Sequence, residues 1–335
     1  MNNSQQNMNN SQQIIPDTMP YSLEDIQNCK DITLDRRLRD WNNLKKFKAD
    51  INPRKFCGNP LIYHHQYRNL IKTRRGDRNY KTIEDIWKDE DEKQKLWDES
   101  VQRNRRDKSP YPSVVDVFEC HRINRGSIVI FKSSTAKYIY KMFNCKNVLD
   151  PTAGWGGRLL GAGSLGIKYT GIDTNLELKE GYDNMIKECN IQNCEMIWKS
   201  CFDVDYKTIN PDLVLTSPPY SNMELYQGMK PWVSDDEFYT KFLIPLLDKL
   251  EEETCCPVCI NMSPKMYKTL IKKYGRQECN EKIDVRQQLG QQYKTKSQDY
   301  VYVWKPTDEK QIKHHTTRLV MEHLSNLPPS CGISP

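Results

Sequence analysis

Two prolines and an aromatic ring follow directly on a short apolar run in Thr216-Ser217-Pro218-Pro219-Tyr220. The preceding residues, Asp212 to Leu215, have the composition of a buried strand. Proline lacks the N–H that a strand ladder needs, so the pair ends the strand abruptly and fixes the backbone that follows it. Such rigidity suits a binding or catalytic site.

A glycine-rich turn is the second candidate for chemistry. The stretch from Asp150 to Gly157, DPTAGWGG, lies between a predicted strand and a helical pattern, and Asp173 ends the next strand about 20 residues later. Glycines at such a turn let the backbone approach a ligand closely, and an acid at that place can bind ribose hydroxyls. The spacing differs from GxGxxG, and no GxxxxGK[ST] occurs. A nucleoside-bearing cofactor is favoured over NAD or a P-loop nucleotide, and a tight packing corner is the alternative.

Together the two stretches resemble the S-adenosylmethionine-dependent amino-methyltransferases, which methylate exocyclic amines of adenine or cytosine in nucleic acid. Asp150 to Gly157 matches the cofactor loop of that family, and Ser217 to Tyr220 matches its catalytic motif, [Asp/Asn/Ser]-Pro-Pro-[Tyr/Phe]. The longer text DPTAGWGGRLLGA is also similar to the cofactor loop of viral and phage DNA methylases. The resemblance covers Pro112 to Lys305 and leaves the N-terminal third unmatched.

This resemblance implies S-adenosylmethionine as the cofactor. No metal site is expected. A helix N-terminus at Lys132 to Ser134 would receive the methionine carboxylate, with a plain helix cap as the alternative. Asp203 would accept from the adenine amino group, and as a lone turn acid it is equally compatible with no role. The predicted cofactor contacts are Lys132, Ser133, Ser134, Asp150, Pro151, Gly154, Gly156, Asp173 and Asp203.

The catalytic residues predicted from the resemblance are Ser217, Pro218, Pro219 and Tyr220. An exocyclic amine is a poor nucleophile, but N–H groups held by the Ser217 side chain and the Pro218 carbonyl would let its lone pair point at the methyl group. Tyr220 would stack on a base flipped out of a duplex. A carbon-5 cytosine methylase would need a nucleophilic thiol here, and none is present.

The serine slightly favours cytosine N4 over adenine N6 as the methylated amine in DNA. RNA is an alternative substrate, because base stacking and basic residues serve both nucleic acids. A catalytically inactive nucleic-acid-binding protein is the alternative from another class. The expected partner is therefore DNA, with RNA as the alternative. No membrane association is expected, and whether a restriction nuclease is a partner stays open.

Strand patterns alternate with helical or loop stretches in the second part of the chain, at 147–150, 169–173, 195–198, 212–216, 258–262 and 300–304. Such alternation predicts a parallel sheet with crossover helices. The fold class expected is therefore α/β, a Rossmann-like doubly wound and mostly parallel sheet, with a smaller helical N-terminal region. The resemblance adds that the last strand is antiparallel.

Four consecutive ranges are predicted along the chain. Residues 1–20 are an Asn/Gln/Ser-rich disordered leader, 21–112 a basic and mainly helical region, 113–306 the methyltransferase domain and 307–335 a tail. Pro110-Tyr111-Pro112 breaks the helical pattern and sets the main boundary.

Basic residues concentrate in the N-terminal region. Residues 30–108 contain 22 Lys and Arg against 14 Asp and Glu, a net charge of +8, whereas the whole chain carries +6. Interleaved aromatic rings make this mixture suitable for phosphate contacts and base stacking. A solvated helical face is the alternative, because apolar residues recur there at helical spacing. The nucleic-acid contacts predicted are Arg36, Arg37, Arg39, Lys45, Lys46, Arg74 and Arg75, and target recognition could also come from the stretch after Tyr220 or from 290–296.

The twelve cysteines are scattered and show no disulfide framework, so reduced thiols are expected. Cys256-Pro-Val-Cys259 has the spacing of half a zinc site, but no second pair exists, and a buried strand is favoured. No apolar run approaches the roughly 18 residues of a membrane span. The expectation is a soluble, intracellular protein, cytoplasmic or nuclear.

Overall fold

The computed structural model describes residues 15–48, 57–76, 80–104, 111–126, 128–223, 225–226, 229–285 and 300–309. The chain forms two compact units that alternate along the sequence. A helical unit comprises residues 1–31, 66–129 and 222–230, and an α/β unit comprises residues 32–65, 130–221 and 231–335. Within the described ranges, no helix has the length and apolar character needed to cross a membrane.

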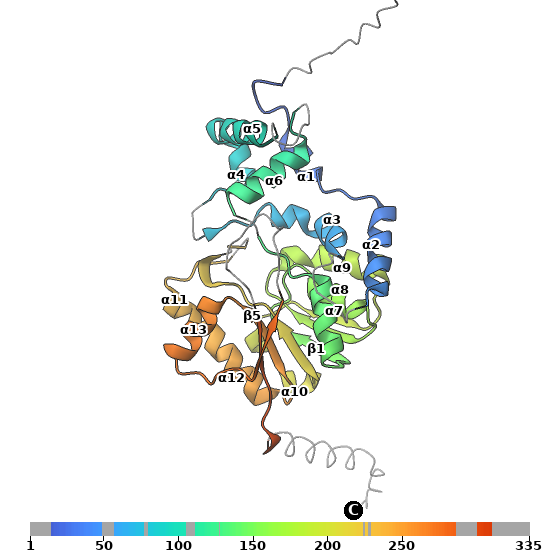
Figure 1. Ribbon diagram of the computed structural model, residues 1–335, viewed down its shortest axis with the longest axis vertical. Helices are drawn as coiled ribbons and strands as arrows, with labels where there is room; N and C mark the ends of the chain where they lie inside the picture. Colours follow the sequence, from blue (N-terminus) through green and yellow to red (C-terminus); the bar gives the residue numbers. More distant parts are fainter. Residues whose placement is uncertain are drawn as a thin grey trace, which may run out of the picture. The chain divides into compact units, whose positions relative to one another are not determined.

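A seven-stranded sheet with the order β3-β2-β1-β4-β5-β7-β6 forms the centre of the α/β unit (Figure 1). β1 to β5 are parallel, and β7 is antiparallel to both of its neighbours, β5 and β6. This arrangement confirms the predicted fold class, a mostly parallel doubly wound sheet with an antiparallel last strand. The strands are β1 (Asn147–Asp150), β2 (Lys168–Ile172), β3 (Cys194–Ile197), β4 (Leu213–Thr216), β5 (Val258–Met262), β6 (Glu281–Asp284) and β7 (Tyr300–Trp304).

Burial along the strands follows their place in the sheet. Every residue of β4 and β5 is buried, because central parallel strands are covered on both faces. β3 lies at one edge and β6 at the other, and each is partly exposed. β6 has a single buried residue, Ile283, in a charged sequence, which explains why no strand was predicted there.

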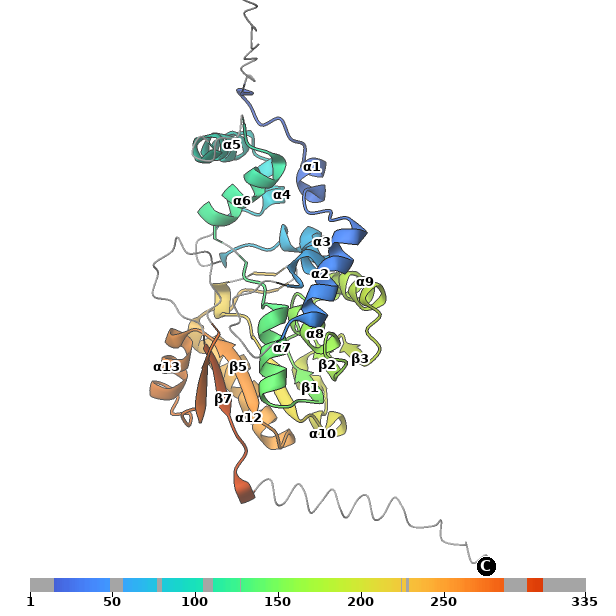
Figure 2. The ribbon, with the colours of Figure 1, turned by 45° about the vertical axis from the view of Figure 1, so that its right-hand side comes forward.

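Helices cover both faces of this sheet (Figure 2). α7 and α8 pack closely through Gly161, where a Cβ would lie 2.7 Å from the Cβ of Ala136. The main apolar core includes Phe238, Leu246 and Leu270, packed with side chains of β4, β5 and β7. The helices of this unit, besides the first half of α3, are α2 (Leu34–Lys46), α7 (Ser133–Met142), α8 (Gly157–Gly163), α9 (Lys179–Cys189), α10 (Tyr206–Ile209), α11 (Asp235–Phe238), α12 (Ile244–Glu253) and α13 (Pro264–Lys272), with one π turn at Tyr239–Leu243.

The helical unit has its own apolar core. Trp97 is buried and donates through Nε1 to the carbonyl of Pro16 at 2.9 Å, and the Tyr67 and Phe118 rings pack edge to face at 5.0 Å. A short antiparallel bridge joins Arg74 to Leu225 by two backbone hydrogen bonds, so the stretch 222–230 is part of this unit. Its helices are α1 (Leu23–Asn28), the second half of α3 (Asn59–Leu70), α4 (Ile83–Trp87), α5 (Glu90–Asn104) and α6 (Val114–Asn124).

The two units do not follow the four consecutive ranges expected from the sequence. Residues 32–65 belong with the α/β unit, where the Lys137 ammonium donates to the carbonyls of Leu44 and Lys45 at 2.7 and 2.8 Å. The Arg37 guanidinium also pairs with Glu188 of α9 at 2.8 Å. α2 is therefore part of the packing of the α/β unit, and a functional division of the chain at residue 112 stays a prediction.

Candidate active site

Both predicted loops lie at the carboxyl edge of the sheet. β1 and β4 pair in parallel, with Val148 opposite Leu213 and Leu149 opposite Val214, so the loops that follow them start side by side. In doubly wound sheets, ligands bind outside the carboxyl ends of the strands, at the point where the strand order reverses. Here that point falls between β1 and β4.

The glycine loop after β1 has a backbone that requires its glycines. Gly154 and Gly156 have φ angles of +60° and +93°, in the left-handed region. A Cβ on Gly156 would lie 2.6 Å from the Cε atom of Met185. On Gly157 it would lie 1.9 Å from the carbonyl oxygen of Phe131, so the start of α8 touches the backbone that precedes α7.

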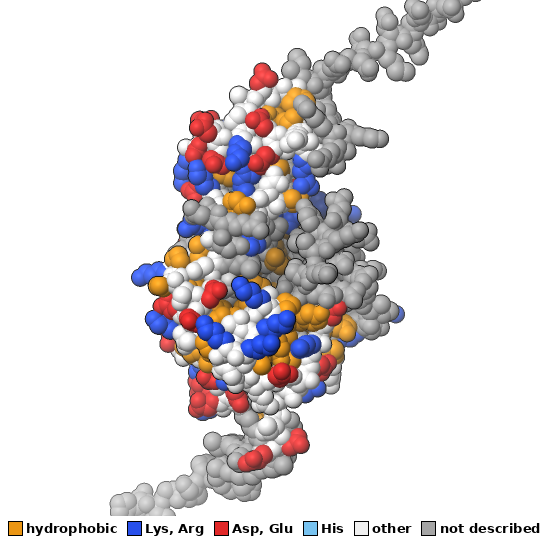
Figure 3. Space-filling view, turned by 60° about the vertical axis from the view of Figure 1, so that its left-hand side comes forward, with side chains coloured by type: hydrophobic (Ala, Val, Ile, Leu, Met, Phe, Trp, Pro, Cys, Tyr) orange, Lys and Arg blue, Asp and Glu red, His pale blue; other side chains and the backbone are white. Residues whose placement is uncertain are grey.

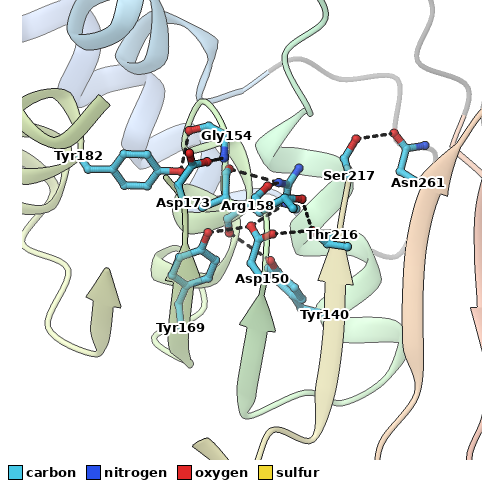
Figure 4. Close-up of polar contacts among 12 residues, drawn as sticks. Tyr140, Asp150, Gly154, Arg158, Tyr169, Asp173, Tyr182, Thr216, Ser217 and Asn261 are labelled. Atoms are coloured by element: carbon cyan, nitrogen blue, oxygen red, sulfur yellow. Dashed lines mark hydrogen bonds and ion pairs between the residues drawn. The ribbon is translucent and has the colours of Figure 1, made fainter. Parts of the chain in front are cut away.

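Asp150 lies fully buried beneath this loop and accepts three hydrogen bonds (Figure 4). Its Oδ2 accepts from Arg158 Nε at 2.7 Å and from the Tyr169 hydroxyl at 2.8 Å. Its Oδ1 accepts from the Thr216 hydroxyl at 3.0 Å. The carboxylate therefore joins β1, β2, β4 and α8, and in this structure it supports the predicted cofactor loop from below.

Arg158 was not predicted as a site residue. Its buried guanidinium donates to Asp150 and also to the carbonyls of Thr152 and Ala153. Burial disfavours the charged guanidinium, but the Asp150 carboxylate outweighs that effect, so the pKa of Arg158 is raised. The pair fixes the path of the glycine loop, and the sequence signal for it was only an arginine in the first turn of the helix after the loop.

Asp173 lies where the predicted ribose contact should be, at the end of β2. Its two carboxylate oxygens accept from the backbone N–H of Gly154 at 2.8 Å and of Asn175 at 2.9 Å. The Tyr182 hydroxyl, also unpredicted, donates to the Gly154 carbonyl at 2.9 Å. Burial raises the pKa of Asp173, and the two N–H groups oppose this shift. A carboxylate has about four acceptor positions, so capacity remains for the hydroxyls of a ribose.

The predicted contacts at the start of α7 are buried. Lys132 precedes the helix as its N-cap residue, and the side chains of Ser133 and Ser134 are fully buried. Gly58 lies directly over Ser133, where a Cβ would be 2.5 Å from the serine oxygen. Burial lowers the pKa of Lys132 to about 8. Of the remaining predicted contacts, Pro151 is buried in the glycine loop and Asp203 is exposed.

The catalytic motif begins at the end of β4 and contacts the neighbouring strand. The Ser217 hydroxyl donates to Asn261 Oδ1 at 3.2 Å, and the Tyr220 hydroxyl donates to the same oxygen at 3.4 Å. Asn261 Nδ2 donates to the Tyr300 carbonyl at 3.1 Å, which fixes the orientation of the amide. Pro218 is buried, and Pro219 is partly exposed.

Asn261 was missed at the sequence level, although it left a signal. It is the one residue with an amide side chain in the buried strand Val258–Met262, and the residue is 3% exposed. A polar residue in a buried strand needs partners. Here it has the Tyr300 carbonyl on one side and the hydroxyls of Ser217 and Tyr220 on the other.

The predicted nucleic-acid contacts are divided between the two units. On α2, Arg36, Arg39, Lys45 and Lys46 are exposed, whereas Arg37 is buried and holds Glu188 with two hydrogen bonds of 2.8 Å. Arg74 and Arg75 are partly buried in the helical unit. The guanidinium of Arg37 is therefore engaged within the α/β unit. The loop 290–296, also predicted to recognise the target, lies outside the described residues.

Net charge is also divided unequally between the units. The three stretches of the helical unit contain 17 Lys and Arg and 17 Asp and Glu, so their net charge is zero. The +6 of the whole chain therefore lies on the α/β unit. The basic excess of residues 30–108 does not correspond to a basic helical unit, because part of it comes from residues 32–65.

Cys256 and Cys259 have the spacing of half a zinc site. Both are buried, and Cys259 lies within β5. Among the residues that the structure describes, no three His, Cys, Asp or Glu side chains are grouped so that they could hold a metal ion.

Comparisons with known proteins concern the fold. No protein-family model and no curated protein matches the sequence. A solved RNA methyltransferase from Salinibacter ruber, in complex with S-adenosyl-L-homocysteine, is 16% identical over 54% of this chain and 95% of that chain, with a TM-score of 0.36. A SAM-dependent methyltransferase from Neisseria gonorrhoeae is 15% identical over 56% and 78%, with a TM-score of 0.36. An rRNA methylase from Streptococcus thermophilus is 11% identical over 54% and 100%, again with a TM-score of 0.36.

Proposed function

We propose that the protein transfers a methyl group from S-adenosylmethionine to an exocyclic amine of a base in nucleic acid. The observation that carries this proposal is the position of Ser217-Pro-Pro-Tyr220 at the end of β4, beside the glycine loop that ends β1. The two loops adjoin at the edge of the sheet where this kind of fold binds ligands.

The residues present fit such a cofactor. The backbone at Gly154 is open to close approach, since the nearest protein atoms that a Cβ there would meet lie 3.9 Å away, and Asp173 keeps acceptor positions for ribose hydroxyls. The Lys132 ammonium, at the start of α7, would attract the methionine carboxylate. When bound, S-adenosylmethionine supplies an electrophilic methyl group.

Ser217 would act as a hydrogen-bond acceptor for the amine. A hydroxyl has one donor and two lone pairs, and in this structure the donor is directed at Asn261 Oδ1. The hydroxyl proton therefore points away from the substrate, and a lone pair of the Ser217 oxygen can accept one N–H group of the amine. The Pro218 carbonyl can accept the second N–H group. These two hydrogen bonds would orient the amine nitrogen with its lone pair toward the methyl carbon. The N–C bond would form as the methyl group's S–C bond breaks, the thioether would leave, and the nitrogen would then lose one proton to solvent.

Tyr220 would stack on the base, with its hydroxyl held by Asn261. No strong base is needed before transfer, because the amine becomes acidic only as it gains positive charge. This agrees with a motif that contains no His, Glu or Cys.

The substrate we propose is DNA, and the preferred amine is cytosine N4 over adenine N6. Both rest on the likeness of the SPPY motif to the DNA amino-methyltransferases described above. RNA would be accepted by the same stacking and hydrogen bonding, so the experiment has to separate the two nucleic acids.

Transfer of tritium from labelled S-adenosylmethionine to duplex DNA, single-stranded DNA and tRNA tests the proposal. We expect label in DNA, N4-methylcytosine in its nucleosides by mass spectrometry, and no transfer by Tyr220→Ala, which should still bind the cofactor. N6-methyladenine alone would correct the choice of amine, and label in tRNA alone would correct the choice of nucleic acid. A protein that binds nucleic acid and transfers no label to any of them would be the inactive alternative.

A further inference from the structure

One face of α13 is a row of lysines. Lys265, Lys268 and Lys272 are exposed and lie three and four residues apart, which places them on one side of the helix. The opposite side is buried in the core through Met266, Tyr267 and Leu270. We call these three exposed residues the α13 lysine face.

Acidic residues near this face are engaged with other cations. Asp236 pairs with Lys273, while Asp248 and Glu251 pair with Arg276. In the described part of the chain, Lys265, Lys268 and Lys272 take part in no ion pair within 4.0 Å. Three uncompensated ammonium groups on one short helix create a positive potential that favours an anionic ligand.

A lysine of β6, held against two aromatic rings, adds a further positive charge near α13. Lys282 of β6 lies over the rings of Tyr267 and Tyr302, with its ammonium 4.8 and 5.8 Å from their centroids. Those two rings stack at 4.0 Å. Figure 3 brings forward the side of the α/β unit that carries α11 and α13 in Figure 1, and Lys and Arg side chains gather there beside hydrophobic ones.

The lysine face begins close along the chain to the candidate active site. α13 starts at Pro264, two residues after β5 ends, and Asn261 of β5 holds the Ser217 hydroxyl. Lys265 is therefore close in sequence to the catalytic edge, and Lys272 lies about 10 Å further along the helix axis, at 1.5 Å per residue. A nucleic-acid strand carries one negative charge per roughly 3.4 Å of its helix axis, so the face matches the length of about three phosphates.

We propose that the α13 lysine face binds the sugar–phosphate backbone of the nucleic-acid strand that presents the target base. This proposal rests on the proposed function for the choice of ligand, and on the geometry of α13 for its place. Lysine is a compact point charge that attracts phosphate without reading base edges. The face would thus position the strand at the catalytic loop, while the SPPY loop would select the amine.

Charge reversal of the face tests this inference. In K265E/K268E/K272E, we expect duplex and single-stranded oligonucleotides to bind at least tenfold more weakly near 0.1 M salt. The slope of log affinity against log salt should fall by about 2 to 3, because each phosphate contact contributes about 0.7 to 0.9. The neutral variant K265Q/K268Q/K272Q should show an intermediate loss. Cofactor affinity should stay within about twofold.

A matched control is available at the opposite edge of the sheet. Three lysines there are exposed: Lys146 directly precedes β1, Lys168 is the first residue of β2, and Lys207 lies in α10 before β4. K146E/K168E/K207E therefore makes the same change in net charge at the amino ends of the strands, away from the catalytic loop. We expect it to keep at least half of the wild-type salt slope and affinity. Equal losses in the two variants would show a non-specific effect of net charge and would overturn the proposal.

The outcomes separate this inference from the proposed function. If the wild type methylates nucleic acid but K265E/K268E/K272E keeps its salt slope, the lysine face is wrong and the function stands. If the wild type transfers no methyl group, but the salt slope of nucleic-acid binding is lost in K265E/K268E/K272E, the lysine face stands and the proposed function is wrong. Loss of binding to phosphatidylserine vesicles, with oligonucleotide binding unchanged, would assign the face to a membrane surface and overturn the proposal.

Discussion

The two halves of the candidate active site are built differently. In the cofactor half, the fully buried Asp150 accepts from Arg158, Tyr169 and Thr216, and Asp173 accepts two backbone N–H groups. In the catalytic half, the hydroxyls of Ser217 and Tyr220 share one acceptor, Asn261 Oδ1, at 3.2 and 3.4 Å. The first half is a closed buried network, and the second is a partly exposed loop held at longer distances.

This difference corresponds to what each half would bind. A cofactor has one shape, so a loop fixed by a buried ion pair can be complementary to it before binding. A base arrives on a polymer and has to enter the site, and a loop with fewer internal bonds can adjust to it. Substitutions in the first half should therefore reduce stability or cofactor affinity, and substitutions in the second half should reduce the rate of methyl transfer.

The largest effect is expected from Asp150→Ala. It leaves the buried Arg158 guanidinium without its carboxylate, which should reduce the free energy of unfolding by about 3–5 kcal/mol. Urea denaturation followed by circular dichroism measures the change. Asp203→Ala is the control, since this exposed side chain should change stability by no more than about 0.5 kcal/mol. An unchanged midpoint for Asp150→Ala would show that the network does not stabilise the fold.

Ser217→Ala should reduce the methyl-transfer rate by about 10²-fold or more, because a fixed group at the reacting amine is lost. Asn261→Ala should reduce it by about tenfold, because the Ser217 hydroxyl loses its hydrogen-bond acceptor. If Asn261 acts by orienting the Ser217 hydroxyl, the double variant should be no slower than Ser217→Ala alone. Single-turnover rates at saturating cofactor measure this, and additive losses would show that Asn261 acts by another route.

Asp173→Ala should weaken S-adenosylmethionine binding by roughly 1–3 kcal/mol, about 5- to 150-fold, through loss of charge-assisted hydrogen bonds. Isothermal calorimetry gives the affinity, and Asp173→Asn should lose less because it keeps one acceptor oxygen. A folded Asp173→Ala protein with wild-type affinity would remove this residue from the cofactor site.

The smallest effect concerns Lys132, whose pKa is lowered by burial to about 8. Its charged form is needed to attract the methionine carboxylate, so cofactor affinity should be constant below pH 8 and fall by up to about tenfold per pH unit above it. Stability should move in the opposite direction. The unfolded lysine has a pKa of about 10.4 and binds more protons between pH 8 and 10.4, so this residue's contribution to stability rises with pH in that window. Calorimetry on Lys132→Met should show no such fall in affinity, and a fall equal to that of the wild type would contradict the assignment.

The parts of the site that could be predicted are those whose residues are adjacent in the sequence. The glycine loop and the SPPY motif each lie within eight consecutive residues, and the strands before them are short apolar runs. Tyr169 and Asn261 escaped prediction because their roles depend on which strands pair and in which register. Asn261, for example, reaches Ser217 because β4 and β5 are neighbours, with Thr216 opposite Ile260. Arg158 contacts Asp150 only eight residues before it, and its place in the first turn of α8 was the only local signal for that pair.

Contacts between residues far apart in the sequence also explain why the role of Arg37 and the place of residues 222–230 were not predicted. Arg37 belongs to a basic stretch, but its pairing partner, Glu188, lies far along the chain in α9. The stretch 222–230 follows the catalytic motif directly, yet it packs with the helical unit through Leu225 and Arg74. Neither contact has a local pattern in the residues that make it.

The pairing of Arg74 with Leu225 has a consequence for the order in which the protein can be assembled during synthesis. The helical unit begins near the N-terminus, but its last stretch, 222–230, is translated only after β1 to β4. The α/β unit, in turn, cannot complete its sheet until β7 has been made. Neither unit can therefore finish folding before most of the chain has been synthesised. The entropy loss of bringing distant segments together falls on this last stage of folding in both units.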